Sequence, residues 1–587
     1  MNTLIAEAQN LLKNLTVGEN GETAFLSTGD KSMDLFGTIN RGGEISNLVS
    51  KFEAAWNENP ELAIKVILNF RDVREGKGEK LIGKVLIFLL KLTQPDVYTQ
   101  LLPTFVEVGC WKDIMFLVEL TTNYCKELEK IGIKSHYNSM YNSMYNISEI
   151  KLLGDQLKID STVERPSLCA KWAPTEGCHY DKKTNLATSL MTYMGFRPKE
   201  YRKMLTELRA KIRLVETQLS QNKFQEINFS TIPSRAHLMY KKAFLRDSNA
   251  EGTTVAARTE LHARYIKYLE DLKAGQTKAN FKGIMPHELV AEILKGGEGQ
   301  ELIENQWKSI RENIENVSIF DRCLSIVDVS SSMESAGGMG PRPIDVAIAL
   351  GILVSECSKG IFKHKVITFH EHPTIVNLSN FKTLASKVHE CKSMPWGGST
   401  DMEAVFDEIL KIGSFANLTQ EQMPDKLFIF TDMQFNQVSG RHLKTFDKIE
   451  AKYKKHGYKM PQIICWNLRT VASVAFTKDD EGVCLLSGFS TEIMKAFLTC
   501  ETLTPMSVFL AAIGHYKVPL DVKSLKQVNF SIVNVKMLET AVEHSDLNFK
   551  DHDDPKVKAW EEKKALAQTR PVRGAFSGRG RGRGRGR

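Results

Sequence analysis

The stretch Leu324-Ser325-Ile326-Val327-Asp328-Val329-Ser330-Ser331-Ser332 decides the fold of the second half of the chain. Its first four residues are mostly apolar, which is typical of a strand buried on both faces of a parallel sheet. Polar side chains follow at once, where the strand ends. Open α/β sheets bind their ligands at this edge. We therefore expect a mostly parallel, helix-covered sheet with a binding site at the carboxyl ends of its strands.

Further apolar segments alternate with helical ones along the rest of this half. This alternation indicates a Rossmann-like α/β domain over residues 316–548. The expected strands are 364–369, 426–432, 461–466 and 483–487, and the expected helices are 344–358, 402–412 and 442–455.

Three separate segments bring oxygen ligands to the same expected edge. They supply two carboxylates and three hydroxyls, from Asp328, Ser330, Ser332, Thr400 and Asp432. Hard oxygen ligands suit Mg²⁺, or another divalent cation such as Mn²⁺, and this set leaves one coordination position open. Asp401 either contacts the ligand residues without binding the ion or is simply the first-turn acid of its helix, and we favour the second interpretation.

The order Asp328-x-Ser330-x-Ser332, then Thr400, then Asp432 resembles the metal-ion-dependent adhesion site of von Willebrand A domains. In that family these residues hold the ion directly or through water, and an acidic residue of a protein partner often completes the coordination. A coincidental or degenerate motif is one alternative. A Mg²⁺-dependent phosphoryl-transfer enzyme is another, but there is no GxxxxGK[ST] loop, and His364 and His370 have no matched nucleophile or acid. We therefore predict a non-catalytic protein.

The first half of the chain has helical periodicity and no strand signal. We expect a short extension over residues 1–35 and an all-α, HEAT-like repeat module over 36–315. Residues 135–160 are polar and predict a loop or insertion, whereas 200–221 predict one helix.

Two turns in this half, Asn69–Lys80 and Val108–Asp113, resemble the helical-repeat (TROVE) module of the Ro autoantigen family. The segments Lys171–Pro174, Tyr201-Arg202, Ile232–Ser234 and Tyr240–Phe244 are similar to the domain-of-unknown-function 2828 family. The Ro resemblance implies a ring of helices, closed by the von Willebrand A domain, that binds RNA. The first turn also has a structural interpretation, in which its glycines allow a tight bend and Arg71 pairs with Asp72. Trp111 would then be a packing anchor.

The segment 197–246 carries twelve Lys or Arg against four Glu. A basic helical face is what phosphate contact needs, and the few aromatics argue against sequence-specific readout. Arg202, Arg209 and Arg213 have near-helical spacing that would place them on one face. The alternative is a solvated surface paired with acids. The RNA-binding candidates are Arg197, Lys199, Arg202, Lys203, Arg209, Lys211, Arg213, Lys241 and Lys242.

Residues 549–587 predict a disordered, Arg-Gly-rich tail. Nine Lys or Arg and no acid lie from Lys563 to the end, so the net charge of +8 leaves the other 562 residues at 8 − 9 = −1. Arginines among glycines reach phosphates and stack on bases. A solubilising tail is the alternative. The further RNA-binding candidates are Arg573, Arg579, Arg581, Arg583, Arg585 and Arg587.

Ten scattered cysteines with no CxxC pair indicate a reducing compartment. Cys169, Cys178 and His179 fit no common zinc spacing, so buried thiols are favoured. The N-terminus does not resemble a secretory signal, and no apolar run predicts a membrane span. We expect a cytoplasmic protein, with the nucleus as a second location. The predicted function is an RNA-binding component of a ribonucleoprotein, taking small structured or single-stranded RNA. Its Mg²⁺ site would hold an acidic protein partner. The alternative is a protein scaffold whose RNA binding is limited to the tail.

Overall fold

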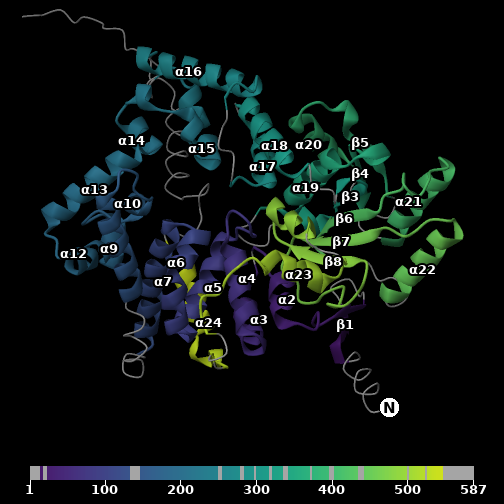
Figure 1. The fold of residues 1–587 in the computed structure, drawn as a ribbon, viewed down its shortest axis with the longest axis horizontal. Coiled ribbons are helices and arrows are strands. Elements are labelled where there is room, and N and C mark those ends of the chain that lie inside the picture. Colours follow the sequence, from purple (N-terminus) through teal and green to yellow (C-terminus); the bar gives the residue numbers. More distant parts are fainter. Residues whose placement is uncertain are drawn as a thin grey trace, which may run out of the picture.

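The computed structural model divides the molecule into a helical part and an α/β part (Figure 1). It describes residues 13–17, 23–41, 43–132, 146–248, 254–277, 283–296, 299–315, 320–334, 341–369, 373–394, 402–433, 442–498, 502–521, 525 and 527–545. None of the helices within these ranges is both long and apolar enough to cross a bilayer.

Helices make up nearly all of the first half beyond residue 30, as the periodicity predicts. Each of the helices from α3 to α6 packs on the next one. Local signals start several of them; α4, for example, begins at Pro60, and the Asn59 side chain caps it by accepting a hydrogen bond from the Leu62 amide. The HEAT-like assignment stays a prediction. The helices are α2 (Lys31–Thr38), α3 (Ile45–Glu58), α4 (Pro60–Arg71), α5 (Lys80–Thr93), α6 (Pro95–Val108), α7 (Trp111–Lys130), α9 (Ile147–Thr162), α10 (Cys169–Trp172), α11 (His179–Thr184), α12 (Leu186–Met194), α13 (Pro198–Ile212), α14 (Val215–Ser220), α15 (Ser234–Leu245), α16 (Ala256–Lys273), α17 (Pro286–Leu294) and α18 (Gln300–Ile314).

A six-stranded sheet, in the order β5-β4-β3-β6-β7-β8, forms the centre of the second half. Its pairs are parallel except β4 with β5, so the prediction of a mostly parallel sheet is confirmed. The edge strand β5 was not predicted. The strands are β3 (Cys323–Asp328), β4 (Lys365–Phe369), β5 (Ile375–Asn377), β6 (Lys426–Thr431), β7 (Gln462–Asn467) and β8 (Val483–Ser487).

Helices cover this sheet, and one of them is wholly enclosed. Every residue of α19 (Pro343–Cys357) is buried, because this helix packs against β3, β4 and β6 as well as α17 and α20. Such a helix is apolar all round rather than amphipathic. The other helices of this half, of which α24 lies away from the sheet, are α20 (Leu384–Ser393), α21 (Met402–Phe415), α22 (His442–Lys455), α23 (Pro505–Ile513) and α24 (Val535–Glu543).

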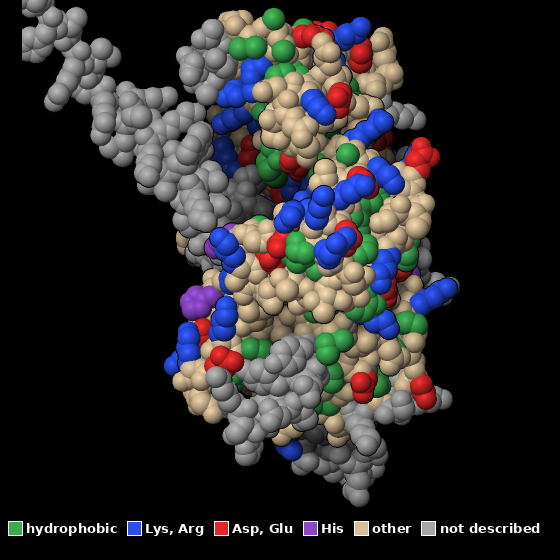
Figure 2. Space-filling model, turned by 90° about the vertical axis from the view of Figure 1, so that its left-hand side faces the viewer, with side chains coloured by type: hydrophobic (Ala, Val, Ile, Leu, Met, Phe, Trp, Pro, Cys, Tyr) green, Lys and Arg blue, Asp and Glu red, His purple; other side chains and the backbone are tan. Residues whose placement is uncertain are grey.

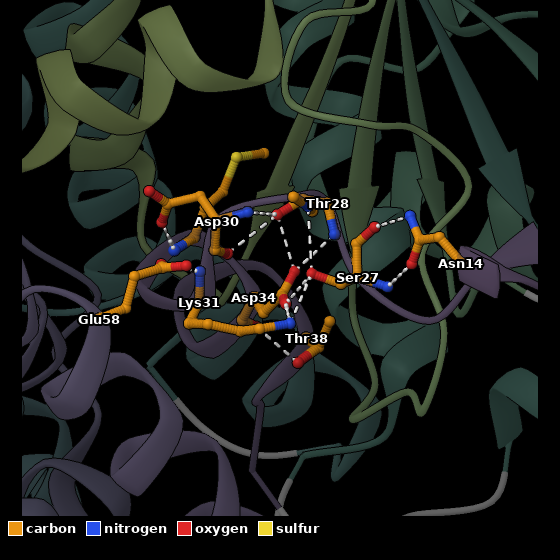
Figure 3. A network of polar contacts seen from close by, with 10 residues as sticks. Asn14, Ser27, Thr28, Asp30, Lys31, Asp34, Thr38 and Glu58 are labelled. Carbon is orange, nitrogen blue, oxygen red and sulfur yellow. Dashed lines mark hydrogen bonds and ion pairs between the residues drawn. The ribbon is translucent and has the colours of Figure 1, made fainter. Parts of the chain in front are cut away.

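The start of the chain packs against the α/β part. A short hairpin of β1 (Leu15–Val17) and β2 (Thr23–Phe25) leads into α2, and Phe25 bridges to Val474. The buried carboxylate of Asp34 accepts hydrogen bonds from the Ser27 hydroxyl at 2.5 Å and the Thr28 amide at 2.7 Å, which fixes the bend between hairpin and helix (Figure 3). The predicted extension 1–35 therefore contains ordered structure in its described part.

The end of the described chain returns to the helical part. Helix α24 lies beside α7 and α3 (Figure 1). The Asn534 amide donates to the Tyr124 hydroxyl at 3.0 Å, and the Ser545 hydroxyl donates to Glu119 at 3.0 Å. The two parts are thus joined at both ends of the described chain.

Two sequence-based predictions of the helical part are wrong. The segment 135–160 was expected to be a loop, but α9 begins at Ile147; residues 133–145 lie outside the described residues. Helix α9 buries mainly Leu153 and Leu157 of its apolar side chains, a stripe too narrow to stand out in a polar sequence. The helix expected over 200–221 is interrupted at Arg213, whose φ of 53° ends α13.

Candidate metal centre and basic face

The carboxylates of Asp328 and Asp432 follow neighbouring strands. In the β3–β6 register Val327 lies opposite Phe430, which sets Asp328 beside Thr431 and one residue from Asp432. The chain continues from β3 to β4 on one side, and β6 lies on the other. This is the switch point of a doubly wound sheet, where ligands bind outside the carboxyl ends of the strands.

Both aspartates are fully buried. Asp328 accepts hydrogen bonds from the Ser330 amide at 2.9 Å and from the Thr431 hydroxyl at 2.7 Å. Burial, and next the charge of Asp432, raise the pKa of Asp328 to about 6. Two neighbouring buried carboxylates repel one another, so a cation between them would stabilise both.

Two hydroxyls, a guanidinium and a sharp backbone turn lie beside the two carboxylates. The Ser330 and Ser332 hydroxyls lie 3.0 Å apart, so these two predicted ligands converge. Arg469, after β7, places a guanidinium nitrogen 3.8 Å from Asp432. Met433 adopts a φ of 66°, a left-handed conformation that turns the chain sharply after Asp432.

Four of the five predicted metal ligands therefore gather at one sheet edge, and the fifth, Thr400, lies outside the described residues. The donor set consists of oxygens on short side chains, which fits Mg²⁺ or Mn²⁺ better than softer metals. If bound, the ion would be held by Asp328, Ser330, Ser332 and Asp432.

The glycine-rich turn between α4 and α5 is a junction between the two parts of the molecule. The side chain of Lys77 is fully buried, donates to the Phe36 carbonyl and to the Ser487 hydroxyl at 2.5 Å, and lies over the rings of Phe36 and Phe70. Ser487 ends β8, so this lysine joins the turn to the sheet. Burial lowers the pKa of Lys77 to about 7.

The glycines of this turn have specific backbone reasons. A Cβ on Gly76 would lie 2.2 Å from the Asn69 carbonyl oxygen, and Gly78 has a φ of 64°. The tight bend proposed from the sequence is therefore present.

The expected ion pair within this turn is wrong. Arg71 pairs with Asp113 at 2.7 Å, not with its neighbour Asp72. Asp72 instead accepts a hydrogen bond from the Tyr516 hydroxyl at 2.9 Å. Trp111 begins α7 and is half-buried against the core. The turn thus connects successive helices and the α/β part, which sequence spacing alone could not reveal.

Helix α13 presents the basic segment to solvent. Its buried side is Tyr201, Met204, Leu205 and Leu208. Figure 2 looks onto the side of the molecule formed by α9, α12 and α13, where Lys and Arg side chains spread over the middle with fewer acidic ones between them. The predicted RNA-binding residues that are exposed here and in α15 are Arg197, Lys199, Arg202, Lys203, Lys211, Arg213 and Lys242.

Some of these cations have acidic neighbours, as the alternative interpretation expects. Arg197 pairs with Glu200 at 2.7 Å, Arg202 with Glu176 at 2.5 Å, and Lys203 approaches Glu207 at 3.9 Å. Within the described residues, Lys199, Lys211, Arg213 and Lys242 have no ion pair. Lys211 also donates to the Val163 carbonyl at 3.2 Å, so Lys199, Arg213 and Lys242 are the cations most available to phosphate.

Two predicted RNA-binding residues are engaged in the fold itself. Arg209 donates to the carbonyls of Ala170 and Ala173 and so caps the short helix α10. Lys241 is buried and pairs with Glu292 at 3.0 Å. Arg202, Arg209 and Arg213 do not form the shared solvent-facing row expected from their spacing, and Arg209 and Lys241 are not part of the exposed basic surface.

The cysteines are free thiols throughout the described residues. Cys169 is buried, and burial raises the pKa of its thiol well above its usual range. The tail arginines, Arg573 to Arg587, lie outside the described residues.

The chain matches two family models. The "Domain of unknown function (DUF2828)" covers residues 18–146 and 125–319, and the "Domain of unknown function (DUF7788)" covers residues 322–508. The chain belongs to the DUF2828 family. The boundary between the two matches falls where α18 ends and β3 is about to begin, so the DUF2828 region corresponds to the helical part.

A relative of this DUF2828 protein is the "Uncharacterized protein L728" of Acanthamoeba polyphaga mimivirus. It is 41% identical over 520 residues, which span 86% of this chain and 88% of the viral protein. Among solved structures, the "Crystal structure of Deinococcus radiodurans RO (RSR) protein" matches with a TM-score of 0.37 and 14% identity, over 79% of this chain and 93% of that one.

Proposed function

We propose that this protein is a non-catalytic, RNA-binding component of a ribonucleoprotein that also carries a divalent-cation adhesion site. The observation that supports RNA binding is the exposed face of α13. Its large apolar residues Tyr201, Met204, Leu205 and Leu208 are buried, whereas Lys199, Lys203, Lys211 and the following Arg213 are exposed. The resemblance of the helical part to the Ro family, noted from its turns, points in the same direction.

The binding that this face supports is directed at the RNA backbone. Lys and Arg neutralise phosphates and release counterions, which makes such binding strongly salt-dependent but indifferent to sequence. The Arg-Gly tail would add further phosphate contacts. We place the complex in the cytoplasm, with the nucleus as a second location.

The metal site supports the second part of the proposal. A strand order of β5-β4-β3-β6-β7-β8 with one antiparallel edge strand, and buried aspartates at the switch point, fit a von Willebrand A-like domain. With Thr400, the site would hold Mg²⁺ or Mn²⁺ and leave a position for an acidic residue of a protein partner.

The experiment for the RNA part compares the full chain with a chain lacking residues 563–587. Fluorescence anisotropy with a labelled single-stranded RNA, at a series of salt concentrations, should show salt-sensitive binding by the shortened chain. Loss of all binding on removing the tail would favour the scaffold alternative instead.

A paired substitution then tests the face itself. The variant Lys199→Gln/Arg213→Gln should weaken RNA binding and reduce the slope of log K against log salt by about one for each phosphate that is no longer neutralised. The matched control is Lys411→Gln, which alters a lysine that is 75% exposed on α21 in the other part of the molecule. Equal losses in both variants would contradict a specific role of α13.

The metal site and the RNA surface should be separable. We expect Asp328→Ala to abolish capture of an acidic partner and to leave RNA affinity unchanged, because Asp328 lies in the α/β part and α13 in the helical part. A large loss of RNA affinity would show that the metal site takes RNA directly.

A further inference from the structure

A polar pocket lies between α16 and the two 3₁₀ turns that precede α15. Its volume is about 450 Å³, within the range of roughly 300–1,000 Å³ usual for ligand sites. The turns are η2 (Phe224–Glu226) and η3 (Phe229–Thr231). Neither the metal site nor the face of α13 includes it.

One wall of the pocket is a fixed guanidinium. Arg264 donates to the carbonyls of Phe224 at 2.9 Å and Ile227 at 2.8 Å, and its guanidinium carbon lies 5.7 Å from the centre of the Phe229 ring. These contacts hold the guanidinium plane in place. A held guanidinium plane is one of the surfaces on which unpaired RNA bases stack.

The floor is aromatic and contains a buried hydroxyl with no hydrogen-bond partner. Tyr268 lines the pocket, is only 8% exposed, and packs against Phe229 with ring centres 5.4 Å apart. Among the residues that the structure describes, nothing accepts a hydrogen bond from its hydroxyl. A buried polar group without a partner costs free energy, so a ligand that offers an acceptor would be favoured here.

The rim combines a cation with amide groups, and the acidic residues Glu226 and Asp271 also line the pocket. Lys267 is exposed, lines the pocket, and has no ion pair within the described part of the chain. The Asn228 side-chain oxygen accepts from the Ser230 amide and hydroxyl, which leaves its amide nitrogen facing no described acceptor. Amides that can donate and accept are suited to base edges, and a lysine is suited to phosphate.

We propose that this pocket binds one nucleotide of a single-stranded RNA, with the base stacked on the Arg264 guanidinium and the phosphate at Lys267. This deepens the proposed function and rests on it only in naming RNA as the source of the nucleotide. The pocket lies within the same stretch of chain as the basic segment, since η2 and η3 follow α14 directly.

The test measures binding of AMP, CMP, GMP and UMP to the full chain by saturation-transfer NMR and calorimetry, with ribose 5-phosphate as the baseless probe. At least one nucleotide should bind well above ribose 5-phosphate. Equal binding of ribose 5-phosphate would reduce the site to phosphate capture, and absence of binding by all four nucleotides would leave only a solvated crevice. Either result overturns the proposal.

Two variants separate a ligand role from a structural one. Lys267→Gln should weaken nucleotide binding several-fold, whereas Lys273→Gln, an exposed lysine at the end of the same helix, should not. Tyr268→Phe should weaken nucleotide binding roughly 2- to 10-fold, the size of one hydrogen bond, and leave the melting temperature equal or higher because the hydroxyl has no partner in the free protein. A Tyr268→Phe protein that melts lower but binds nucleotide normally would contradict the proposal.

The same measurements keep the two proposals apart. The variant Lys199→Gln/Arg213→Gln should reduce binding of long RNA and leave mononucleotide binding unchanged. Nucleotide binding without any RNA binding would remove the proposed function and keep the pocket. RNA binding that is insensitive to Lys267→Gln would remove the pocket proposal and keep the proposed function.

Discussion

Lys77 and Lys199 are the same residue type in the same helical part, yet they lie in opposite environments. Lys77 is fully buried at the junction with the sheet, between two phenylalanine rings, and Lys199 is exposed at the start of α13. A basic residue in a family motif can therefore hold the fold together, while one outside it can be left exposed to solvent. Burial, not residue type, separates the two environments.

The same contrast holds for two ion pairs. Arg71 and Asp113 are 3% and 4% exposed, whereas Arg202 and Glu176 are 54% and 31% exposed. Four substitutions, in order of expected effect, test whether burial decides what such residues contribute.

The largest effect is expected from Arg71→Met. Removing one partner of a buried ion pair leaves Asp113 without its cation, which typically costs about 3–5 kcal/mol of unfolding free energy. Urea denaturation followed by circular dichroism measures this loss. A cost below about 1 kcal/mol would show that the buried pair behaves like a surface one.

The second effect concerns the metal site. At a Mn²⁺ concentration of about 100 times the dissociation constant, bound metal should stabilise the wild-type protein by about 2.7 kcal/mol. Asp328→Ala should abolish the metal-dependent rise in melting temperature, and Ser331→Ala, which alters an exposed neighbour outside the ligand set, should retain it. A rise that survives in Asp328→Ala would place the ion elsewhere.

The third effect is a pH dependence. The pKa of Lys77 is lowered from 10.5 to about 7 in the folded protein by burial, so between these values the unfolded chain binds more protons than the folded one. The lysine therefore makes the unfolding free energy rise with pH across this window, by at most about 1.4 kcal/mol per unit.

Lys77→Met should flatten that rise. The measurement is the difference in unfolding free energy between wild type and variant at pH 7, 8 and 9, with Lys199→Met as the exposed control. Parallel curves for wild type and Lys77→Met would mean that Lys77 stays charged when folded.

The smallest effect is expected from Arg202→Gln. Exposed ion pairs contribute little because water and salt screen them, so the unfolding free energy should change by less than about 1 kcal/mol. Thermal denaturation alongside Arg71→Met provides the check. Comparable losses in the two variants would show that the buried and the exposed ion pair contribute equally to stability.

The features predicted correctly from the sequence are those with local signatures. Strands β3 and β6 are nearly continuous apolar runs, and Asp328 and Asp432 follow them at once, so the sheet and the pairing of its two acids could be anticipated. The helices from α3 to α7 show helical periodicity, and α4 and α6 begin at Pro60 and Pro95. The edge strand β5 is only three residues long and half-exposed, and such strands have little signal.

The features missed depend on contacts between distant residues. The partner of Arg71 is 42 positions away, and the hydroxyl that meets Lys77 is 410 positions away. The pocket beside α16 was not anticipated, because its lining comes from two segments and the key property of Tyr268 is an absent partner. Spacing along the chain contains none of this information.

The return of α24 to α7, together with the docking of α2 on the sheet, interlocks the two parts. A protease cut between α18 and β3 would sever the direct covalent link between the two parts. The N-terminal fragment would still contain α2, which packs on β8, and the C-terminal fragment would still contain α24, which packs on α7. The two fragments should therefore stay together as one particle on gel filtration. For the same reason they offer a natural pair for reassembly after separate expression.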